Sequence, residues 1–99
     1  MSHPVGHPLR DRIAVDLVEA DVEAAFSLVD LAEAAVGQGN SVFAADALER
    51  AEEVFGDIEG RLAGLGAGAR TPLAELAAEL RREIDLAKLH HSRAKRRAS

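Results

Sequence analysis

The chain has 99 residues, a length that suits one small domain. Hydrophobic residues make up 47% of it and charged residues 29%, as in an ordinary globular protein and unlike a disordered segment. The absence of cysteine excludes disulfides, thiolate metal sites and cysteine nucleophiles. The sequence has no run of the ~20 apolar residues that a membrane span needs, and residues 1–10 lack the apolar core of a signal peptide, so we expect a cytoplasmic protein.

The apolar part of the sequence is dominated by small side chains. Alanine occupies 20 positions, whereas the aromatic residues are Phe26, Phe43 and Phe55 alone. Burial is worth ~25 cal/mol per Å² of apolar surface, and alanine offers little surface, so each buried residue stabilises a small domain only slightly. We therefore expect a second subunit to help complete the core.

The first predicted helix covers residues 8–36, with Pro8 in its first turn. Valine and alanine recur with gaps of three and four, the spacing of one helical stripe. Together with its apolar neighbours this stripe spans an arc of ~160°, enough to contact at least two other helices. The predicted interaction face of this helix consists of Val15, Val18, Val22, Leu28, Val29 and Leu31.

The second predicted helix covers residues 41–65. Its inward stripe is Ala44, Leu48, Ala51, Phe55, Ile58, Leu62 and Leu65, again with gaps of four and three. Gly56, Gly60 and Gly64 recur every four residues, and each costs ~1 kcal/mol against alanine inside a helix. Two interpretations remain open: a weak helix end that leads into a linker, or a smooth strip on which another helix packs closely.

The third predicted helix covers residues 72–89, with Thr71 as its cap and Pro72 in its first turn. Leu86 and Leu89 fall off its inward stripe, which indicates a second contact or an exposed patch. Residues 90–99 show no apolar period, so we expect a flexible tail. The predicted inward stripe is Leu73, Leu76, Ala77, Leu80, Ile84 and Ala87.

The segment GQGN, residues 37–40, lies where the first stripe stops and the second begins. Gly37 or Gly39 can adopt the left-handed conformation that ends a helix, and Asn40 or Ser41 can cap the next helix. A phosphate-binding loop would need a preceding strand and a Walker-type lysine, and neither is present. The segment therefore predicts a tight corner between antiparallel helices.

This helical hairpin resembles a single tetratricopeptide repeat over residues 28–61. Small and large residues fall at that motif's positions, although Gly56 stands where the repeat usually has proline and no second repeat follows. The resemblance implies binding of a peptide or a protein. The residues that carry it are Leu28, Leu31, Ala32, Ala35, Gly39, Ala44, Leu48 and Ala51.

No residue pattern predicts a catalytic, cofactor-binding or metal site, and we expect no enzyme. His3 and His7 lie at one end of the sequence and His90 and His91 at the other, whereas a metal site needs three or four converging ligands. These histidines are interpreted as surface residues, unless the chain ends meet in a dimer. The carboxylates lack the Glu-x-x-His pairs of a di-metal bundle.

Charge is distributed unevenly along the chain. Residues 1–87 hold all 17 acidic residues and seven arginines, a net charge of −10, whereas residues 88–99 hold five cations and no acid. A polyanion such as nucleic acid could contact Arg93, Lys95, Arg96 and Arg97. No aromatic residue lies between them for base stacking, so a solubilising terminus is the other interpretation.

The sequence thus predicts an all-α fold: an elongated, up-down-up three-helix bundle over residues 1–89, completed by oligomerisation, with a basic tail. We expect a non-catalytic protein–protein interaction or oligomerisation module, either a homo-oligomer or the binder of a partner protein. The alternative is a small regulatory protein that binds nucleic acid or another polyanion through the tail.

Overall fold

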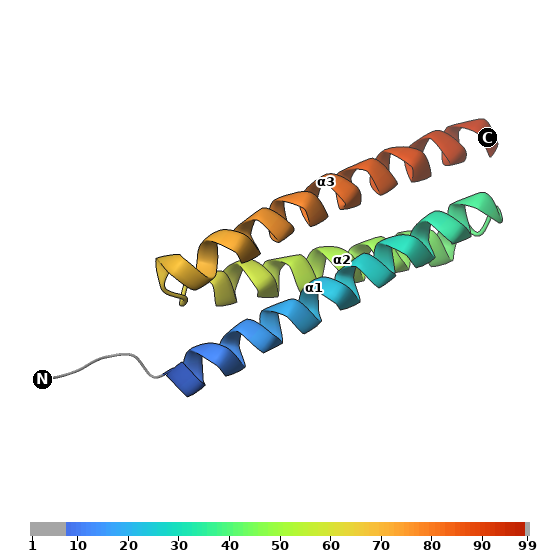
Figure 1. The fold of residues 1–99 in the computed structure, drawn as a ribbon. Helices are drawn as coiled ribbons and strands as arrows, with labels where there is room; N and C mark the ends of the chain where they lie inside the picture. The colour runs from blue at the N-terminus through green and yellow to red at the C-terminus, as the bar shows by residue number, and fades with distance from the viewer. Residues whose placement is uncertain (1–7, 99) are drawn as a thin grey trace, which may run out of the picture.

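The structure, a computed structural model, describes residues 8–98 of the chain. It consists there of three helices, α1 (Pro8–Gly37), α2 (Ser41–Leu62) and α3 (Ala67–Ala98), which run up, down and up (Figure 1). At 1.5 Å per residue, α1 and α3 are ~45 Å long, whereas packed helix axes lie only ~8–10 Å apart. The prediction of an elongated all-α three-helix bundle is confirmed.

The core is apolar along the whole bundle. All three helices contribute to it, and no polar or charged side chain is buried within the part of the chain that the structure describes. Each helix buries one stripe with gaps of three and four, as a 3.6-residue period requires. The core residues are Val18, Val22, Ala25, Val29, Ala32, Ala35, Ala44, Ala47, Leu48, Ala51, Phe55, Ile58, Leu62, Leu65, Leu73, Ala77, Leu80, Ile84 and Ala87.

The predicted corner at residues 37–40 is confirmed. Gly39 has a φ of 75°, in the left-handed region that favours glycine. The Asn40 N–H donates to the Ala35 carbonyl at 2.8 Å, and the Gly39 N–H donates to the Val36 carbonyl at 3.1 Å, the two bonds that close a helix in a Schellman motif. Asn40 then caps α2, because its side-chain oxygen accepts the Phe43 N–H at 3.1 Å.

The turn between α2 and α3 differs from the prediction. Helix α2 ends at Leu62 instead of Leu65, although Leu65 remains buried. Helix α3 begins at Ala67, because the Gly66 carbonyl accepts the first intrahelical bond from the Arg70 N–H at 2.9 Å. Thr71 therefore lies inside the helix, where its hydroxyl donates to the Ala67 carbonyl at 2.9 Å instead of capping.

Pro72 also lies inside α3 instead of in its first turn. Its position one turn after the helix start removes the intrahelical bond that would reach the Gly68 carbonyl. That loss falls near a helix end, where carbonyls and N–H groups are accessible to water, so the helix continues through it.

The prediction of a flexible tail after Leu89 is wrong, because α3 continues to Ala98. His91 and Ala94 extend the spacing of Ala87 by four and three residues, so they lie on the same side of the helix. The tail contacts both other helices. His90 Nδ1 lies 2.8 Å from a Glu33 carboxylate oxygen, and His91 Nε2 lies 3.1 Å from the Ser41 carbonyl.

Two glycines of the predicted strip, Gly56 and Gly60, lie on an exposed side of α2, whereas Gly64 follows the end of that helix. A Cβ built on Gly56 or Gly60 meets no atom within 4 Å, and both residues are exposed. No helix among the described residues packs there. As a separate finding, none of the three helices, over the residues described, is apolar enough for long enough to cross a membrane.

The burial of α3 leads to a first prediction, which compares two leucine truncations on the same helix. Leu80 is fully buried, whereas Leu89 is 42% exposed. Leu80→Ala leaves a cavity in the core and should lower the free energy of unfolding by about 3 kcal/mol. Leu89→Ala should lower it by less than about 1 kcal/mol. Urea denaturation followed by circular dichroism measures both, and equal losses would contradict the assigned helical phase.

Candidate functional site

The predicted interaction face on α1 is largely used inside the chain. Val18, Val22 and Val29 are at most 4% exposed, because they face α2 and α3 in the core. Val15 and Leu28 are half-buried and pack against the same core. This part of the prediction is corrected: the valine stripe holds the bundle together and cannot meet a partner. Leu31 alone of the predicted face is well exposed, at 48%.

The apolar surface that stays open on α1 lies on another side of the helix. Ile13 is 51% and Leu17 44% exposed, and Leu31 follows on the same side. Ala20, Ala24 and Ser27, also exposed, lie between them. We call this set the α1 seam: Ile13, Leu17, Ala20, Ala24, Ser27 and Leu31, with gaps that alternate four and three.

Leu17 and Ala24 are among the apolar neighbours that widen the predicted arc of the first helix. It could not separate the two stripes within that arc, because both have helical spacing. At 100° per residue, the centre of the seam lies ~160° around the helix from Val18, Val22 and Val29. Ile13 was missed because the stripe was counted from Val15 onward.

Two polar contacts show how α1 is oriented between its neighbours. Asp21, the charged residue within the apolar arc, pairs with Arg61 of α2 at 3.2 Å. Glu33, on the opposite flank of the valine stripe, pairs with His90 of α3. The seam lies beyond the Asp21 flank, on the outer side of the α1–α2 hairpin.

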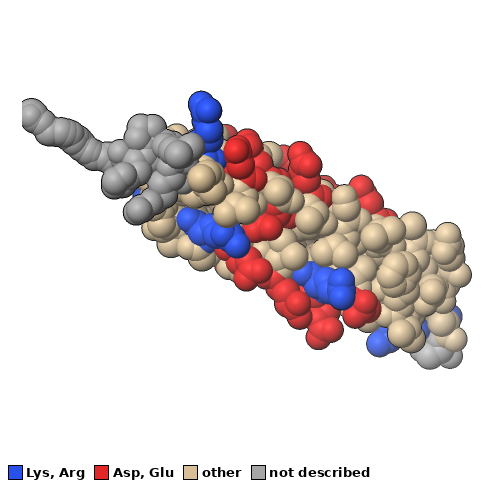
Figure 2. All heavy atoms as spheres, turned by 90° about the horizontal axis from the view of Figure 1, so that it is seen from below, with Lys and Arg blue, Asp and Glu red and all other residues tan. Residues whose placement is uncertain are grey.

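Figure 2 shows this hairpin side of the molecule. Surface without charge runs along it between acidic and basic groups and widens toward the end that holds the α1–α2 corner. On α2, Phe43 is 44% and Val42 81% exposed, near the corner with α1. Five of the eight exposed large hydrophobic residues in the described chain thus belong to the hairpin, so its outer side is the main candidate interaction surface.

A cluster of charged side chains joins α2 to α3. Arg81 donates to both carboxylate oxygens of Glu52, at 2.8 and 2.7 Å, and also donates to Asp85 at 2.8 Å. Lys88 donates to the same Glu52 at 2.7 Å. The Arg81 guanidinium lies 4.9 Å from the centre of the Phe55 ring, a cation–π distance.

These contacts change the ionisation of both partners. The hydrogen bonds from Arg81 lower the pKa of Glu52 to about 2, against a smaller opposing effect of burial and with help from Lys88. The bond to Glu52 in turn raises the pKa of Arg81 above its ordinary value. Two cations hold one carboxylate here. The cluster therefore orients α3 against α2.

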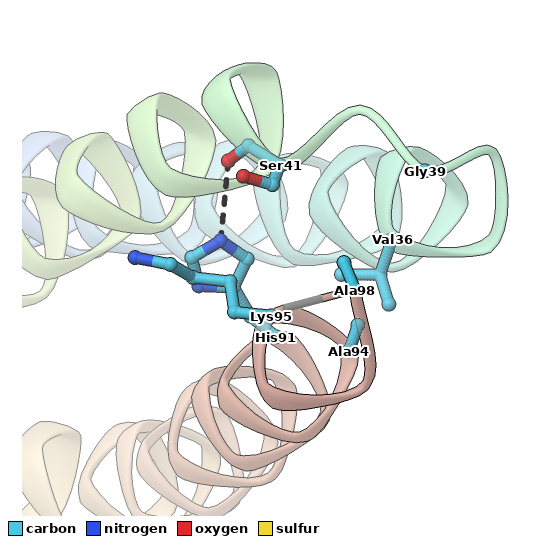
Figure 3. A pocket seen from close by; sticks show the side chains of 7 residues that line it. All are labelled: Val36, Gly39, Ser41, His91, Ala94, Lys95 and Ala98. Atoms are coloured by element: carbon cyan, nitrogen blue, oxygen red, sulfur yellow. Dashed lines mark hydrogen bonds between the residues drawn. The ribbon is translucent and has the colours of Figure 1, made fainter.

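The end of α3 and the α1–α2 corner enclose a pocket of about 270 Å³ (Figure 3). His91 points across it to Ser41, and its Nε2 donates to the Ser41 carbonyl. Pockets for drug-sized ligands are typically ~300–1,000 Å³, so this one is at or below the lower limit. It is lined by Val36, Gly39, Ser41, His91, Ala94, Lys95 and Ala98.

The predicted polyanion contacts lie on the last turns of α3. Arg93, Lys95, Arg96 and Arg97 are all exposed and occupy an ordered helix. Lys95 and Arg96 also have polar partners within the chain. Cations in this position interact favourably with the negative end of the helix dipole. The stabilisation of the end of α3 thus explains part of the basic composition of residues 88–99.

Of the predicted histidines, the two that the structure describes, His90 and His91, do not belong to a cluster of metal ligands. His90 and His91 contact Glu33 and Ser41 separately, and His3 and His7 lie outside the described residues. In the part of the chain that is described, no group of three or more His, Cys, Asp or Glu side chains converges.

No protein-family model matches the chain, and no curated protein or solved structure matches it either. The similarity of the α1–α2 hairpin to a tetratricopeptide repeat therefore stays a prediction.

A second prediction concerns pH and follows from Glu52. Its folded pKa of about 2 lies below the ordinary value of 4.5, so its stabilisation is complete above pH 4.5 and disappears as the pH falls towards 2. With the side chain 32% exposed, solvent screening reduces this contribution to about 1–2 kcal/mol. Glu52→Gln should remove that part of the acid dependence from the free energy of unfolding.

The control is Glu53→Gln, which makes the same change at the neighbouring, exposed position. It should leave the pH dependence close to that of the unmodified protein. Urea unfolding at a series of pH values between 2 and 7 measures both variants. Parallel pH profiles for the unmodified chain and Glu52→Gln would show that the Arg81–Glu52 contact contributes nothing to stability.

Proposed function

We propose that the chain is a non-catalytic protein–protein interaction module that self-associates. The α1 seam carries this proposal: three large hydrophobic side chains, Ile13, Leu17 and Leu31, are each about half exposed along one helix. Monomeric proteins rarely leave a continuous apolar surface of this kind uncovered, and such surfaces mark interfaces. The proposed setting is the cytoplasm.

Other features support an interaction role over catalysis. The core of the described chain buries no polar group that could be tuned as an acid, base or nucleophile. The one carboxylate with a strongly lowered pKa, Glu52, is fully engaged with Arg81 and Lys88. The similarity of the hairpin to a tetratricopeptide repeat, a protein-binding motif, points the same way.

Self-association should appear as a monomer–dimer equilibrium at micromolar concentration in sedimentation equilibrium. Ala24→Glu places a charge in the middle of the seam, where burial against a second chain would be costly, and should weaken the dimer at least ~10-fold. The matched control is Ala78→Glu, the same change at an exposed position of α3, which should leave the equilibrium constant unchanged. A chain that stays monomeric up to millimolar concentration would refute self-association.

The alternative function, polyanion binding through α3, is favoured by one observation. The cations of residues 93–97 lie on a regular helix that continues to Ala98, so they form a fixed array instead of a loose tail. A fixed array loses less entropy on binding than a flexible segment. The acidic remainder of the chain opposes such binding.

Binding of the full chain to a short DNA duplex and a short RNA, measured by fluorescence anisotropy, tests this alternative. If the array binds, affinity should fall steeply as salt rises. It should also fall more than ~10-fold in the double variant Arg93→Glu/Arg97→Glu. The control Arg70→Glu/Arg82→Glu changes two other exposed arginines of α3 and should have a smaller effect. We expect no binding at physiological salt.

A further inference from the structure

We propose that a second copy of this chain packs on the α1 seam, with the two α1 helices antiparallel and related by a two-fold axis near residue 22. This inference rests on the proposed function, because it assumes self-association and adds the surface, the partner and the orientation. Its basis is the order of side chains along the seam, the charges beside it and its size.

The order of side chains is close to symmetric about residue 22. In an antiparallel pair with this centre, Ile13 of one copy faces Leu31 of the other, and Ala20 faces Ala24. Large residues therefore meet at both ends and small residues meet in the middle. A two-fold interface uses the same patch on both chains, so the patch must be complementary to itself, as this one is.

The small residues decide how close the helices can come. Ala20 and Ala24 are exposed and carry only a methyl group, so two helix backbones can approach to ~8 Å at the axis. Ser27 is the one polar member of the seam, and it would face Leu17 of the second copy. Its hydroxyl can bond within its own helix, so this position weakens the contact without preventing it.

The charges beside the seam include one complementary pair in the antiparallel orientation. Arg12 and Asp30 lie on the same flank of the seam, and both are exposed. The antiparallel pairing places Arg12 of each copy within one turn of Asp30 of the other, twice per dimer. The same pairing places Asp16 of each copy within one turn of Asp30 of the other, so the Arg12 contact offsets a repulsion at that position. In a parallel two-fold pair this flank of the two copies would lie on opposite sides of the interface, and Arg12 and Asp30 would not meet.

The size of the seam limits the affinity. From Ile13 to Leu31 it extends over ~27 Å at 1.5 Å per residue. A single helix pair of that length buries less than the ~800 Å² per partner of a standard stable interface. Glu19 and Glu23 also lie near each other across the axis, which opposes association at low salt. We therefore expect a micromolar dimer that tightens as salt is raised.

Cysteine cross-linking of the full chain tests the orientation directly, because the native sequence contains no cysteine. Two single variants are made, Ile13→Cys and Leu31→Cys. In the proposed dimer these two positions face each other across the interface, whereas each lies ~27 Å from its own counterpart, far beyond the Cα separation of ~4–7 Å that a disulfide allows. Mild oxidation of a mixture should give a cross-linked heterodimer, and oxidation of either variant alone should give little.

A third variant, Leu89→Cys, places the thiol at an exposed position of α3 and serves as the control for random collision. Cross-linking of Ile13→Cys with itself would overturn the antiparallel orientation. Equal cross-linking with Leu89→Cys, or a dimer in sedimentation without any cross-link from the seam, would overturn the choice of surface. Those results leave self-association intact. A strictly monomeric chain would instead refute the proposed function along with this inference.

Discussion

The small size of the core side chains is the constraint on which the rest of this structure depends. Eight of the 19 buried hydrophobic residues in the described chain are alanine. A buried methyl removes little surface from water, so the bundle gains stability only by extending the contact over many turns. Long helices follow from this requirement, and so does the large amount of surface that three thin helices leave exposed.

The small residues are concentrated at one end of the bundle. Near the α1–α2 corner the hairpin buries Ala32, Ala35, Ala44 and Ala47, whereas larger side chains fill the core toward the α2–α3 turn. The pocket between the corner and the end of α3 lies at the alanine-rich end. Small side chains fill less of the space between helices there, which gives the pocket a structural explanation without a ligand.

Most of the fold could be predicted from the helical periodicity of the sequence. The stripes of α2 and α3 and the glycine corner depend on local rules and were predicted from them, except that Leu76, predicted on the inward stripe of α3, is 38% exposed. The extension of α3 was missed because His90 and His91 do not count as apolar, although their rings pack beside Glu33 and Ser41. That pairing depends on which helices become neighbours, and the sequence pattern of one helix does not contain this information.

The candidate interaction surface could be predicted even less well from the sequence. The sequence marked α1 as apolar around a wide arc, but only the positions of α2 and α3 decide which part of that arc is buried. The valines are buried in the core, whereas Ile13, Leu17 and Leu31 remain exposed. The Glu52–Arg81 pair joins residues 29 positions apart, and no local pattern predicted it. The candidate interaction surface is therefore defined by the apolar side chains that the fold leaves exposed.

The central claim is that a second copy covers this remaining apolar side of α1. Isotope-filtered nuclear Overhauser measurements on an equal mixture of labelled and unlabelled chains, at millimolar concentration, detect contacts between copies only. The account predicts intermolecular contacts between the methyl groups of Ala20 and Ala24 and between the side chains of Ile13 and Leu31. Intermolecular contacts confined to Leu86 and Leu89 of α3, or none at all, would contradict it.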